Sequence, residues 1–299
     1  QIQIEGVHKV YPTGFHAVRG VDMRLHRGQV TALLGHNGAG KSTTFSMITG
    51  MSMPTKGRIE ILGKDSKADR QKHIGFCPQY NAIFPKLTVD EHIEFFGRLK
   101  GSESWRWTGT RVLAMLGMAD VGNVRAALLS GGMKRKLCIA ISMSADPPIV
   151  LFDEPTAGLD PGARRNYERL LLEWKKDHTI LLTTHYTDEA ELLADRIFIM
   201  AKGKVFCSGS PQFLRKKFDS GYVLSFALNN ENDTEIASNK IFPEMFRKIE
   251  ELGPNLGMQS YGLALNQLEQ VFLKVGEMTG TIDRTAEVEA ALKELIQEN

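Results

Sequence analysis

The chain has 299 residues, of which 42% are hydrophobic and 24% charged, which is the composition of a globular protein with a sizeable core. Its formal net charge of +2 argues against a strongly basic surface for nucleic acid or an anionic membrane. The three cysteines, Cys77, Cys138 and Cys207, form no CxxC pair and stand in apolar contexts, so we expect buried, reduced thiols rather than metal ligands or disulfides.

The first eighty residues predict short strands around a glycine-rich loop. The alternating apolar stretches among these strands favour an antiparallel sheet at the edge of the fold. A helix is expected from Lys41 to Thr49, directly after the glycine-rich loop. The expected strands lie at 1–10, 17–26, 29–34, 58–62 and 74–77.

The stretch from about 79 to 145 lacks strand signals. A capping box of Thr88 and Glu91 begins a mostly helical segment that runs to about residue 118, and Ser130 begins another helix. We therefore expect a helical subdomain inserted into the rest of the fold. The basic run 134–136 on the second helix is interpreted as a solvated face, with a ligand contact as the alternative.

The segment from 149 to about 218 returns to strands alternating with helices. Two continuous apolar runs, 149–152 and 179–184, are typical of strands buried on both faces. Asp160 and Pro161 are expected to begin a helix that runs to about 175. This pattern predicts an α/β fold with a mostly parallel sheet. We also expect a helix at 187–194, a hairpin formed by 196–201 and 205–208, and a helix beginning at Ser210 and Pro211.

Beyond about residue 218 the pattern changes. We interpret 1–218 as one domain, 219–278 as a small α+β regulatory appendage and 279–299 as a charged helical tail. The expected parts of the appendage are strands at 222–228 and 256–265, helices at 241–252 and 267–275, and a polar linker at 229–239.

Residues 35–42 read Gly-His-Asn-Gly-Ala-Gly-Lys-Ser, which is the pattern of a phosphate-binding P-loop. Glycines are needed there because backbone amides must wrap closely around phosphate oxygens. Lys41 is expected to reach the β- and γ-phosphates of ATP, and Ser42 to ligate Mg²⁺. The residues expected to bind nucleotide in this loop are Gly35, His36, Asn37, Gly38, Ala39, Gly40, Lys41, Ser42 and Thr43.

An apolar strand ending in two carboxylates supplies the second half of this chemistry. Asp153 stands at the expected carboxyl end of the strand, where it can hold Mg²⁺ through water. Glu154 follows it and can accept a proton from an attacking water. The two carboxylates predict a nucleotide hydrolase, with solvated turn residues as the alternative interpretation.

With these motifs the chain resembles a nucleotide-binding domain of the ATP-binding cassette (ABC) family over about residues 2–215. The resemblance implies that Tyr11 stacks on adenine and that Gln79 touches Mg²⁺ and communicates with a membrane domain. It also implies that His185 contacts the γ-phosphate as a switch residue, although a histidine at a strand end is more often structural when taken alone.

Two further segments match family motifs that face a second cassette. Ser130, Gly131 and Gly132 match the signature motif, whose amides and helix start would cover the γ-phosphate held by the opposite cassette. Met133 replaces the commoner glutamine, which leaves those amides unaffected. Residues 157–160 resemble the loop that crosses the dimer interface and carries Asp160.

The segments 128–137, 260–262 and 268–274 resemble the A subfamily of eukaryotic cassette transporters, especially the first cassette of a full transporter. A generic amphipathic helix is the alternative interpretation of 268–274. The resemblance implies an ATP hydrolase that powers transmembrane export, with lipids as the expected cargo. The linker 229–240 looks too short for the complete regulatory domain of such relatives.

The expected partners are transmembrane domains, a second ABC cassette and a lipid handled by the membrane part. No apolar run reaches the ~20 residues that span a bilayer. Because the chain begins with Gln1, we expect a segment of a longer protein, placed at the cytosolic face of a membrane. The alternatives are the ATPase subunit of a bacterial-type drug exporter, a soluble cassette ATPase, or a module that uses ATP only to bind a partner.

Overall fold

The structure of the protein is a computed structural model. It describes residues 2–65, 67–218, 222–228, 234–237, 258–265 and 268–280. No helix in these ranges combines the length and the hydropathy needed to cross a bilayer.

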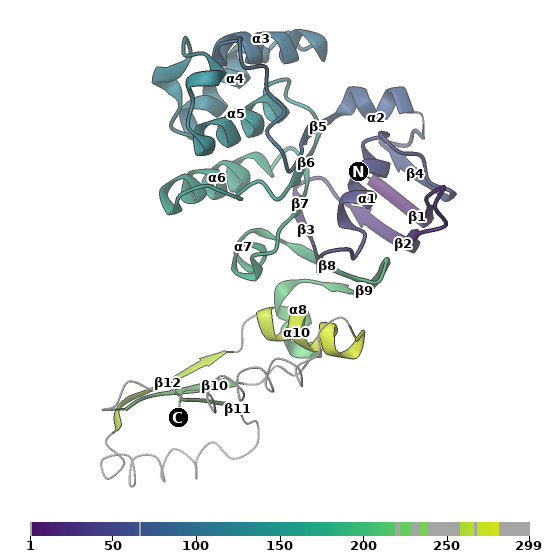
Figure 1. Cartoon of the computed structure of the whole chain (residues 1–299), viewed down its shortest axis with the longest axis vertical. Helices are drawn as coiled ribbons and strands as arrows, with labels where there is room; N and C mark the ends of the chain where they lie inside the picture. Colours follow the sequence, from purple (N-terminus) through teal and green to yellow (C-terminus); the bar gives the residue numbers. More distant parts are fainter. Residues whose placement is uncertain are drawn as a thin grey trace.

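A six-stranded sheet forms the centre of the fold (Figure 1). The strands stand in the order β5-β6-β7-β3-β8-β9, all parallel except β9. Their bounds are β3 Gln29–Gly35, β5 Ile74–Cys77, β6 Ile149–Asp153, β7 Thr179–Thr183, β8 Arg196–Ala201 and β9 Lys204–Gly209. Thr183 pairs with Leu33 on one side and with Asp153 on the other, so the carboxyl ends of β3, β6 and β7 meet at one edge.

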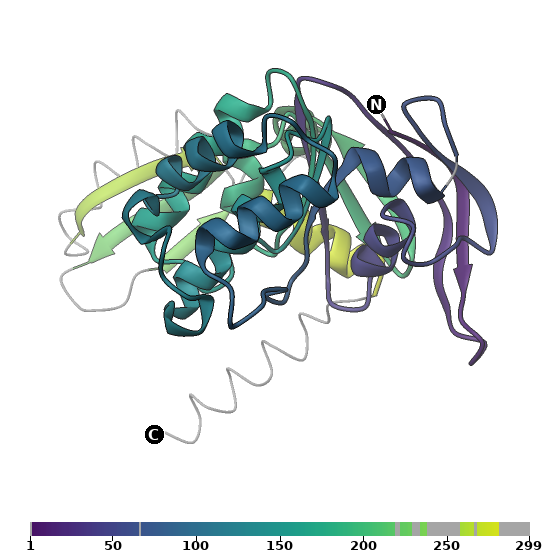
Figure 2. The same ribbon diagram turned by 90° about the horizontal axis from the view of Figure 1, so that it is seen from above.

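The expected antiparallel sheet is confirmed at the amino-terminal end of the chain. Strands β1 (Ile2–Val10), β2 (His16–Leu25) and β4 (Lys56–Ile61) stand in the order β2-β1-β4. Figure 2 shows the first two of them, in purple, at one side of the molecule. Their buried residues, such as Ile4 and Val18, pack around the short helix α1, Lys41–Ile48. This layer therefore lies directly behind the glycine-rich loop.

Helices α3 (Val89–Leu99), α4 (Trp105–Met115) and α5 (Gly131–Met143) lie together at one end of the molecule (Figure 1). The capping box is present, since Thr88 Oγ1 accepts from the Glu91 amide at 3.2 Å and the Glu91 carboxylate accepts from the Thr88 amide at 2.7 Å. Residues 78–148 are all described and contain no strand of a sheet. Their status as a separate subdomain stays a prediction.

Helix α2 (Lys67–His73) was not anticipated from the sequence. Its sequence is almost entirely polar and therefore has no apolar periodicity. Tertiary contacts hold it instead, because the fully buried Arg70 guanidinium donates to the carbonyl oxygens of Met47 (3.1 Å) and Ile59 (3.0 Å).

The helices after β6 begin where the capping residues indicate. Helix α6 spans Pro161–Trp174, α7 spans Thr187–Leu193 and α8 spans Pro211–Lys217. Asp160 Oδ1 accepts from the Ala163 amide at 3.0 Å, and Ser210 Oγ accepts from the Phe213 amide at 3.2 Å. Proline occupies the first turn in both cases, where its missing N–H costs nothing.

The carboxyl-terminal part contains a second antiparallel sheet, in the order β11-β10-β12. Its strands are β10 (Tyr222–Leu228), β11 (Thr234–Ala237) and β12 (Met258–Leu265). The polar linker expected at 229–239 is therefore wrong at 234–237, where Ala237 pairs with Val223. Backbone pairing with β10 forms this strand although its sequence is short and largely polar. The helix expected at 241–252 and the tail beyond residue 280 lie outside the described residues.

Helix α10 (Leu268–Met278) packs onto the main body of the fold rather than onto the small sheet. Leu268, Val271 and Val275 are buried in the same hydrophobic cluster as Leu193 of α7 and Leu214 of α8. The face expected for an amphipathic helix is thus present and covered. The division of the chain at residue 218 stays a prediction, but α10 belongs to the core by packing.

We expect Leu268→Ala to lower the free energy of unfolding by about 2–5 kcal/mol, because the buried side chain leaves a cavity in the core. Chemical denaturation followed by circular dichroism measures this. The matched control is Glu269→Ala, an exposed position on the same helix, which should change stability by no more than about 0.5 kcal/mol. Equal effects of the two variants would contradict the docking of α10.

Candidate functional site

A cavity of about 190 Å³ opens at the carboxyl end of β3, directly over the P-loop. It joins the P-loop to the ends of β5 and β6, as the parallel register requires. Phe15 and Ala17, which the sequence analysis did not assign to a site, also line it. The expected site residues that line the cavity are Asn37, Gly38, Gly40, Lys41, Ser42, Thr43, Gln79 and Glu154.

Lys41 is buried at the bottom of this cavity. Its Nζ donates to the carbonyl oxygens of Gly35 at 2.6 Å and His36 at 3.2 Å. Burial lowers the pKa of Lys41, while the carboxylates of Glu154 and Asp153 act in the opposite direction. A partly desolvated ammonium ion held by carbonyl dipoles is a strong partner for an anion.

The P-loop backbone is shaped for an anion as well. Gly40 is the N-cap of α1 with a φ of 104°, and a Cβ there would lie 2.7 Å from the Ala17 carbonyl oxygen. No side chain caps this helix, so its first amides are available to a ligand. Gly35 and Ala39 are buried and contribute backbone to the loop.

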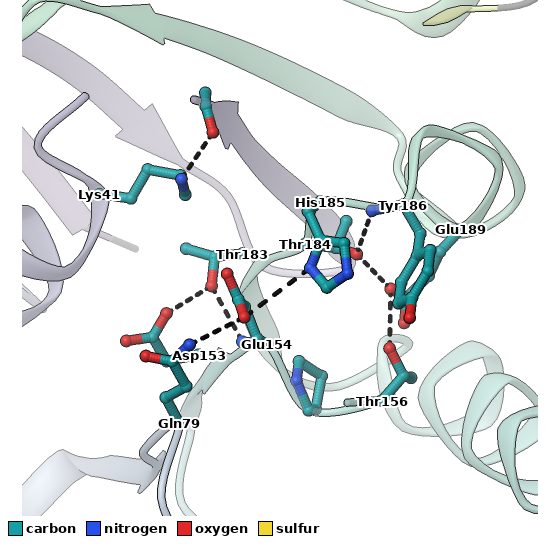
Figure 3. A network of polar contacts seen from close by, with 12 residues as sticks. Lys41, Gln79, Asp153, Glu154, Thr156, Thr183, Thr184, His185, Tyr186 and Glu189 are labelled. Atoms are coloured by element: carbon teal, nitrogen blue, oxygen red, sulfur yellow. Dashed lines mark hydrogen bonds and ion pairs between the residues drawn. The ribbon is translucent and has the colours of Figure 1, made fainter. Parts of the chain in front are cut away.

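The two carboxylates at the end of β6 face different surroundings (Figure 3). Asp153 is buried, and its Oδ1 accepts from Thr183 Oγ1 at 2.6 Å. Glu154 has a φ of 48°, and its amide donates to Thr183 Oγ1 at 3.0 Å. A non-glycine residue in the left-handed region is costly and clusters at functional sites. The turn at Glu154 directs its side chain into the cavity.

The Glu154 carboxylate stands between two further expected site residues. Its Oε2 accepts from Gln79 Nε2 at 2.9 Å and lies 3.7 Å from His185 Nδ1. The His185 side chain is 52% exposed, so it can reach a ligand or a second molecule. The fold thus brings together Lys41, Gln79, His185 and the neighbouring pair Asp153 and Glu154, from four separate segments.

Ser130, Gly131, Gly132 and Asp160 are not part of the cavity lining. Ser130 is the N-cap of α5, and its Oγ accepts from the Met133 amide at 3.2 Å. Asp160 caps α6, and the Ala163 amide holds the pKa of its carboxyl below the usual range. Ser130, Gly131 and Asp160 are exposed.

Tyr11 and His36 lie near the cavity but are not among the residues that line it. Tyr11 Oη lies 3.3 Å from Thr43 Oγ1, and Lys9 Nζ lies 5.5 Å from the centre of its ring. Phe15, in the same loop and 59% exposed, is the aromatic side chain that lines the cavity. The sequence offered one indication of this role, since Phe15 is a second aromatic residue only four positions after Tyr11.

The His36 ring packs against Phe272 of α10, with 4.3 Å between ring centres. Burial lowers the pKa of His36, and the charge of Lys41 acts in the same direction. The second residue of the P-loop therefore contacts the carboxyl-terminal helix rather than the cavity.

The solvated face expected for the basic run 134–136 is wrong for its central residue. Arg135 is 3% exposed, and its guanidinium donates to five carbonyl oxygens at the carboxyl ends of β5 and β6. Arg135 lies three, four and seven residues before Cys138, Ile139 and Ser142, which are also buried, and this helical spacing was the missed signal. The acceptors belong to Pro78 (2.5 Å), Gln79 (3.1 Å), Asp153 (2.8 Å), Glu154 (3.0 Å) and Pro155 (2.9 Å).

The three cysteines are free and buried, as expected. Burial raises the pKa of Cys77 to about 12 and that of Cys138 and Cys207 to about 11. Thiols held in the protonated form are poor nucleophiles and poor metal ligands, so they act as core residues.

A larger hollow of about 520 Å³ lies at the opposite ends of β6 and β7. Trp107, Trp174 and His178 line it together with several charged side chains. These charges are paired with one another, as in Arg27 with Asp177 and Arg111 with Glu173. The smaller cavity over the P-loop is the one that collects the expected site residues.

Comparisons with known proteins agree with this geometry. Residues 18–157 match the family described as "ABC transporter". The chain is an ATP-binding cassette of the ABC transporter family. This confirms the resemblance drawn from its motifs.

The cassette is similar to several A-subfamily proteins. It is 40% identical to the ABC transporter ced-7 of Caenorhabditis elegans over 89% of this chain and 19% of that protein. It is 38% identical to the phospholipid-transporting ATPase ABCA3 of Homo sapiens over 97% of this chain and 19% of that protein. The chain thus spans about a fifth of the length of these relatives.

Solved cassettes share the fold. The ATP-binding subunit of an ABC transporter superposes with a TM-score of 0.69 at 29% identity, over 73% of this chain and 93% of that one. A dimeric cassette in a post-hydrolysis state, bound to ADP and phosphate, superposes with a TM-score of 0.64 at 26% identity, over 70% and 98%. The predicted P-loop α/β fold with a mostly parallel sheet is confirmed.

We expect Arg135→Met to lower the free energy of unfolding by about 3 kcal/mol, because buried carbonyl oxygens lose their donor. Thermal and chemical denaturation measure this. Lys136→Met on the same helix, where the side chain is partly exposed, should stay within about 0.5 kcal/mol of the unsubstituted protein. A stable Arg135→Met variant would show that the two loops hold their positions without this side chain.

Proposed function

We propose that the cassette binds and hydrolyses Mg-ATP in a head-to-tail pair of cassettes and so powers the export of lipids across a membrane. Lys41, Gln79 and Glu154 line one cavity, and His185 stands beside the Glu154 carboxylate; this arrangement carries the proposal. The relatives described as phospholipid-transporting ATPases support lipid as the class of cargo.

Nucleotide binding follows from the P-loop geometry. Lys41 would exchange its two carbonyl partners for phosphate oxygens, and the uncapped start of α1 would direct its amides at them. Phe15 lines the cavity with an exposed ring, and the Tyr11 hydroxyl lies 3.3 Å from the hydroxyl of Thr43, another lining residue. Both aromatic residues are candidates for contact with the base.

The oxygen donors present fit Mg²⁺. Ser42 and Gln79 line the cavity, and the buried Asp153 stands at the end of the neighbouring strand. Hydroxyl, amide and carboxylate oxygens are the ligands this hard cation prefers, together with phosphate oxygens and water. When bound, Mg²⁺ supplies positive charge against the β- and γ-phosphates.

Hydrolysis needs a base beside the phosphate, and Glu154 is placed for that role. The turn at Glu154 points its carboxylate into the cavity, where Gln79 donates a hydrogen bond to it. A water positioned by Gln79 could therefore lose a proton to Glu154 as it attacks the phosphorus. His185, 3.7 Å from the same carboxylate, is placed to contact the γ-phosphate.

The signature residues serve a second cassette in this proposal. Ser130 and Gly131 stand exposed at the start of α5, outside the cavity of their own chain. The positive end of α5 would cover the γ-phosphate of the opposite cassette, while Asp160 would lie in the loop at the interface. ATP would then bind the closed pair better than the open one, and hydrolysis would remove that difference.

Contact with transmembrane domains is assigned to the surface beside Gln79, at the cytosolic face. Tyr80, Phe84 and Phe95 are large apolar side chains that are 72%, 48% and 46% exposed. Phe84 and Phe95 pack edge to face at 5.7 Å, so they form one apolar surface and Phe84 is not a core residue. An apolar surface next to the Gln79 loop fits a helix presented by a membrane domain. We further propose that the cassette is the first of a full transporter.

We expect Lys41→Ala to weaken ATP binding by at least about tenfold, because a charged hydrogen-bond donor to the phosphates is lost. Isothermal titration calorimetry with Mg-ATP measures this affinity. Lys134→Ala, on the partly exposed face of α5, is the control for the loss of one positive charge. Unchanged affinity in Lys41→Ala would contradict the binding site.

We expect Glu154→Gln to bind ATP normally but to lower turnover by about 10²–10⁴-fold, because the amide cannot accept the proton from water. Phosphate release measures turnover. Retention of most turnover would exclude Glu154 as the general base. Because ATP would persist in this variant, light scattering should also detect ATP-dependent pairing.

The control for pairing is Glu154→Gln combined with Ser130→Arg, which places a bulky cation at the start of α5. Loss of the pair in this control would show that the cassette completes its own ATP sandwich. If Glu154→Gln alone binds ATP but stays monomeric, a non-identical cassette is required for pairing.

A further inference from the structure

Close to Glu154 and His185 lies a buried carboxyl group, that of Glu189, which the sequence analysis did not assign to the site. Glu189 stands in the first turn of α7 and is 6% exposed. Its Oε2 accepts from Thr156 Oγ1 at 3.1 Å and from Thr184 Oγ1 at 2.5 Å (Figure 3). One oxygen atom thus holds two different loops from their buried side.

The two loops are those that carry the catalytic side chains. Thr156 is two residues after Glu154, in the loop that leads to Asp160. Thr184 directly precedes His185, and its Oγ1 also accepts from the Tyr186 amide at 3.0 Å. Within the loops, Thr156 and Thr184 are 2% and 1% exposed, whereas His185 is exposed and Glu154 is half-buried.

Helix packing alone does not explain a carboxyl group at this position. Asp188, exposed in the same first turn, already supplies a negative charge near the helix start. Glu189 Oε1 is buried without a hydrogen-bond partner, and so is the Tyr167 hydroxyl of α6. Burial raises the pKa of Glu189, although its hydrogen bonds to Thr184 and Thr156 and the charge of Arg164 oppose this. An unpaired carboxyl oxygen in the interior lowers stability, and an apolar residue would avoid that loss.

We propose that Glu189 is a positioning residue for hydrolysis, which couples the Glu154–Asp160 loop to the His185 segment through Thr156 and Thr184. The coupling rests on the proposed function, since it concerns the two loops that act on ATP. Thr183, the residue before Thr184, makes a similar connection at the ends of β6 and β7. Its hydroxyl bonds to the Asp153 carboxylate and to the Glu154 amide. Glu189 extends this connection outward, to the part of each loop that faces a second cassette in the proposed pair.

The coupling has a consequence for how the site responds to a partner. A displacement of the 157–160 loop would be passed through Thr156 and Glu189 to Thr184, and so to the backbone of His185. The catalytic base and the switch histidine would then move together rather than separately. Since a shift of about 1 Å can cost as much as 10²-fold in rate, loss of the coupling should reduce turnover.

The test compares Thr156→Val, Glu189→Ala and Glu189→Gln in the 299-residue chain. Thr156→Val keeps the shape of the side chain but removes the hydroxyl, so it is the variant least apt to impair folding. We expect Thr156→Val and Glu189→Ala to lower kcat by about tenfold or more, with KM for ATP unchanged within about twofold. The double variant Thr156→Val with Glu189→Ala should have the same kcat as Glu189→Ala alone, because both substitutions remove the same connection.

Glu189→Gln should restore turnover to within about threefold of the unsubstituted protein, since its amide oxygen can accept from both threonines. The matched control is Glu191→Ala on the same helix, whose carboxylate pairs with Arg215 and accepts from the Leu268 amide at 3.2 Å. It should leave kcat unchanged. Wild-type turnover in Thr156→Val, or no rescue by Glu189→Gln, would overturn the proposal.

Hydrogen–deuterium exchange separates this inference from the proposed function. If the unsubstituted protein turns over ATP no faster than Lys41→Ala, hydrolysis itself is contradicted, and the coupling is judged from exchange alone. We expect Thr156→Val to speed amide exchange about tenfold in both 155–160 and 184–186, and Glu191→Ala to leave both segments unchanged. Faster exchange in one segment only, or in neither, would show that Glu189 does not couple them.

Discussion

The parallel pairing of β7 with both β3 and β6 is the constraint on which the site depends. It places Thr183 between Leu33, which precedes the P-loop by two residues, and Asp153, which precedes Glu154. A shift of either strand by one residue would turn its side chains to the other face of the sheet. The Thr183 hydroxyl donates to Asp153 Oδ1 and accepts from the Glu154 amide, so it fixes this register at the edge that carries the candidate site.

Around that edge, the second layer of contacts is built from buried polar side chains. Arg135 reaches the Gln79 loop and the Glu154 turn from α5, and Glu189 reaches the loops after β6 and β7 from α7. Each is buried and bonds mainly to loop segments that have no regular backbone partners. The loops that carry Gln79, Glu154 and His185 are therefore held by buried side chains, while Gln79 and Glu154 line the cavity and His185 is exposed.

The sequence predicted most of the central fold because its signals there are local. Apolar runs mark β6 and β7, and capping residues such as Thr88, Asp160 and Ser210 mark helix starts. The predictions from sequence were wrong or missing where tertiary contacts determine the structure. Helix α2 has no apolar face and is held by the buried Arg70, and Arg135 looked like one more surface cation in a basic run. The P-loop, Asp153, Glu154 and Gln79 were found by motif, but only the fold shows that Phe15 lines the cavity and that His36 meets Phe272.

The amphipathic helix α10 changes how the small antiparallel sheet is joined to the cassette. Lys274 Nζ donates to the Phe218 carbonyl oxygen at 2.8 Å, so the point where the chain leaves the main body is bonded to the helix with which it returns. The small sheet is therefore part of a loop whose two ends are bonded to each other, rather than part of a free tail. A closed loop has fewer conformations than a chain tethered at one end, so a force applied to that sheet would pull on α8 and α10 at once, and through Phe272 on the P-loop itself.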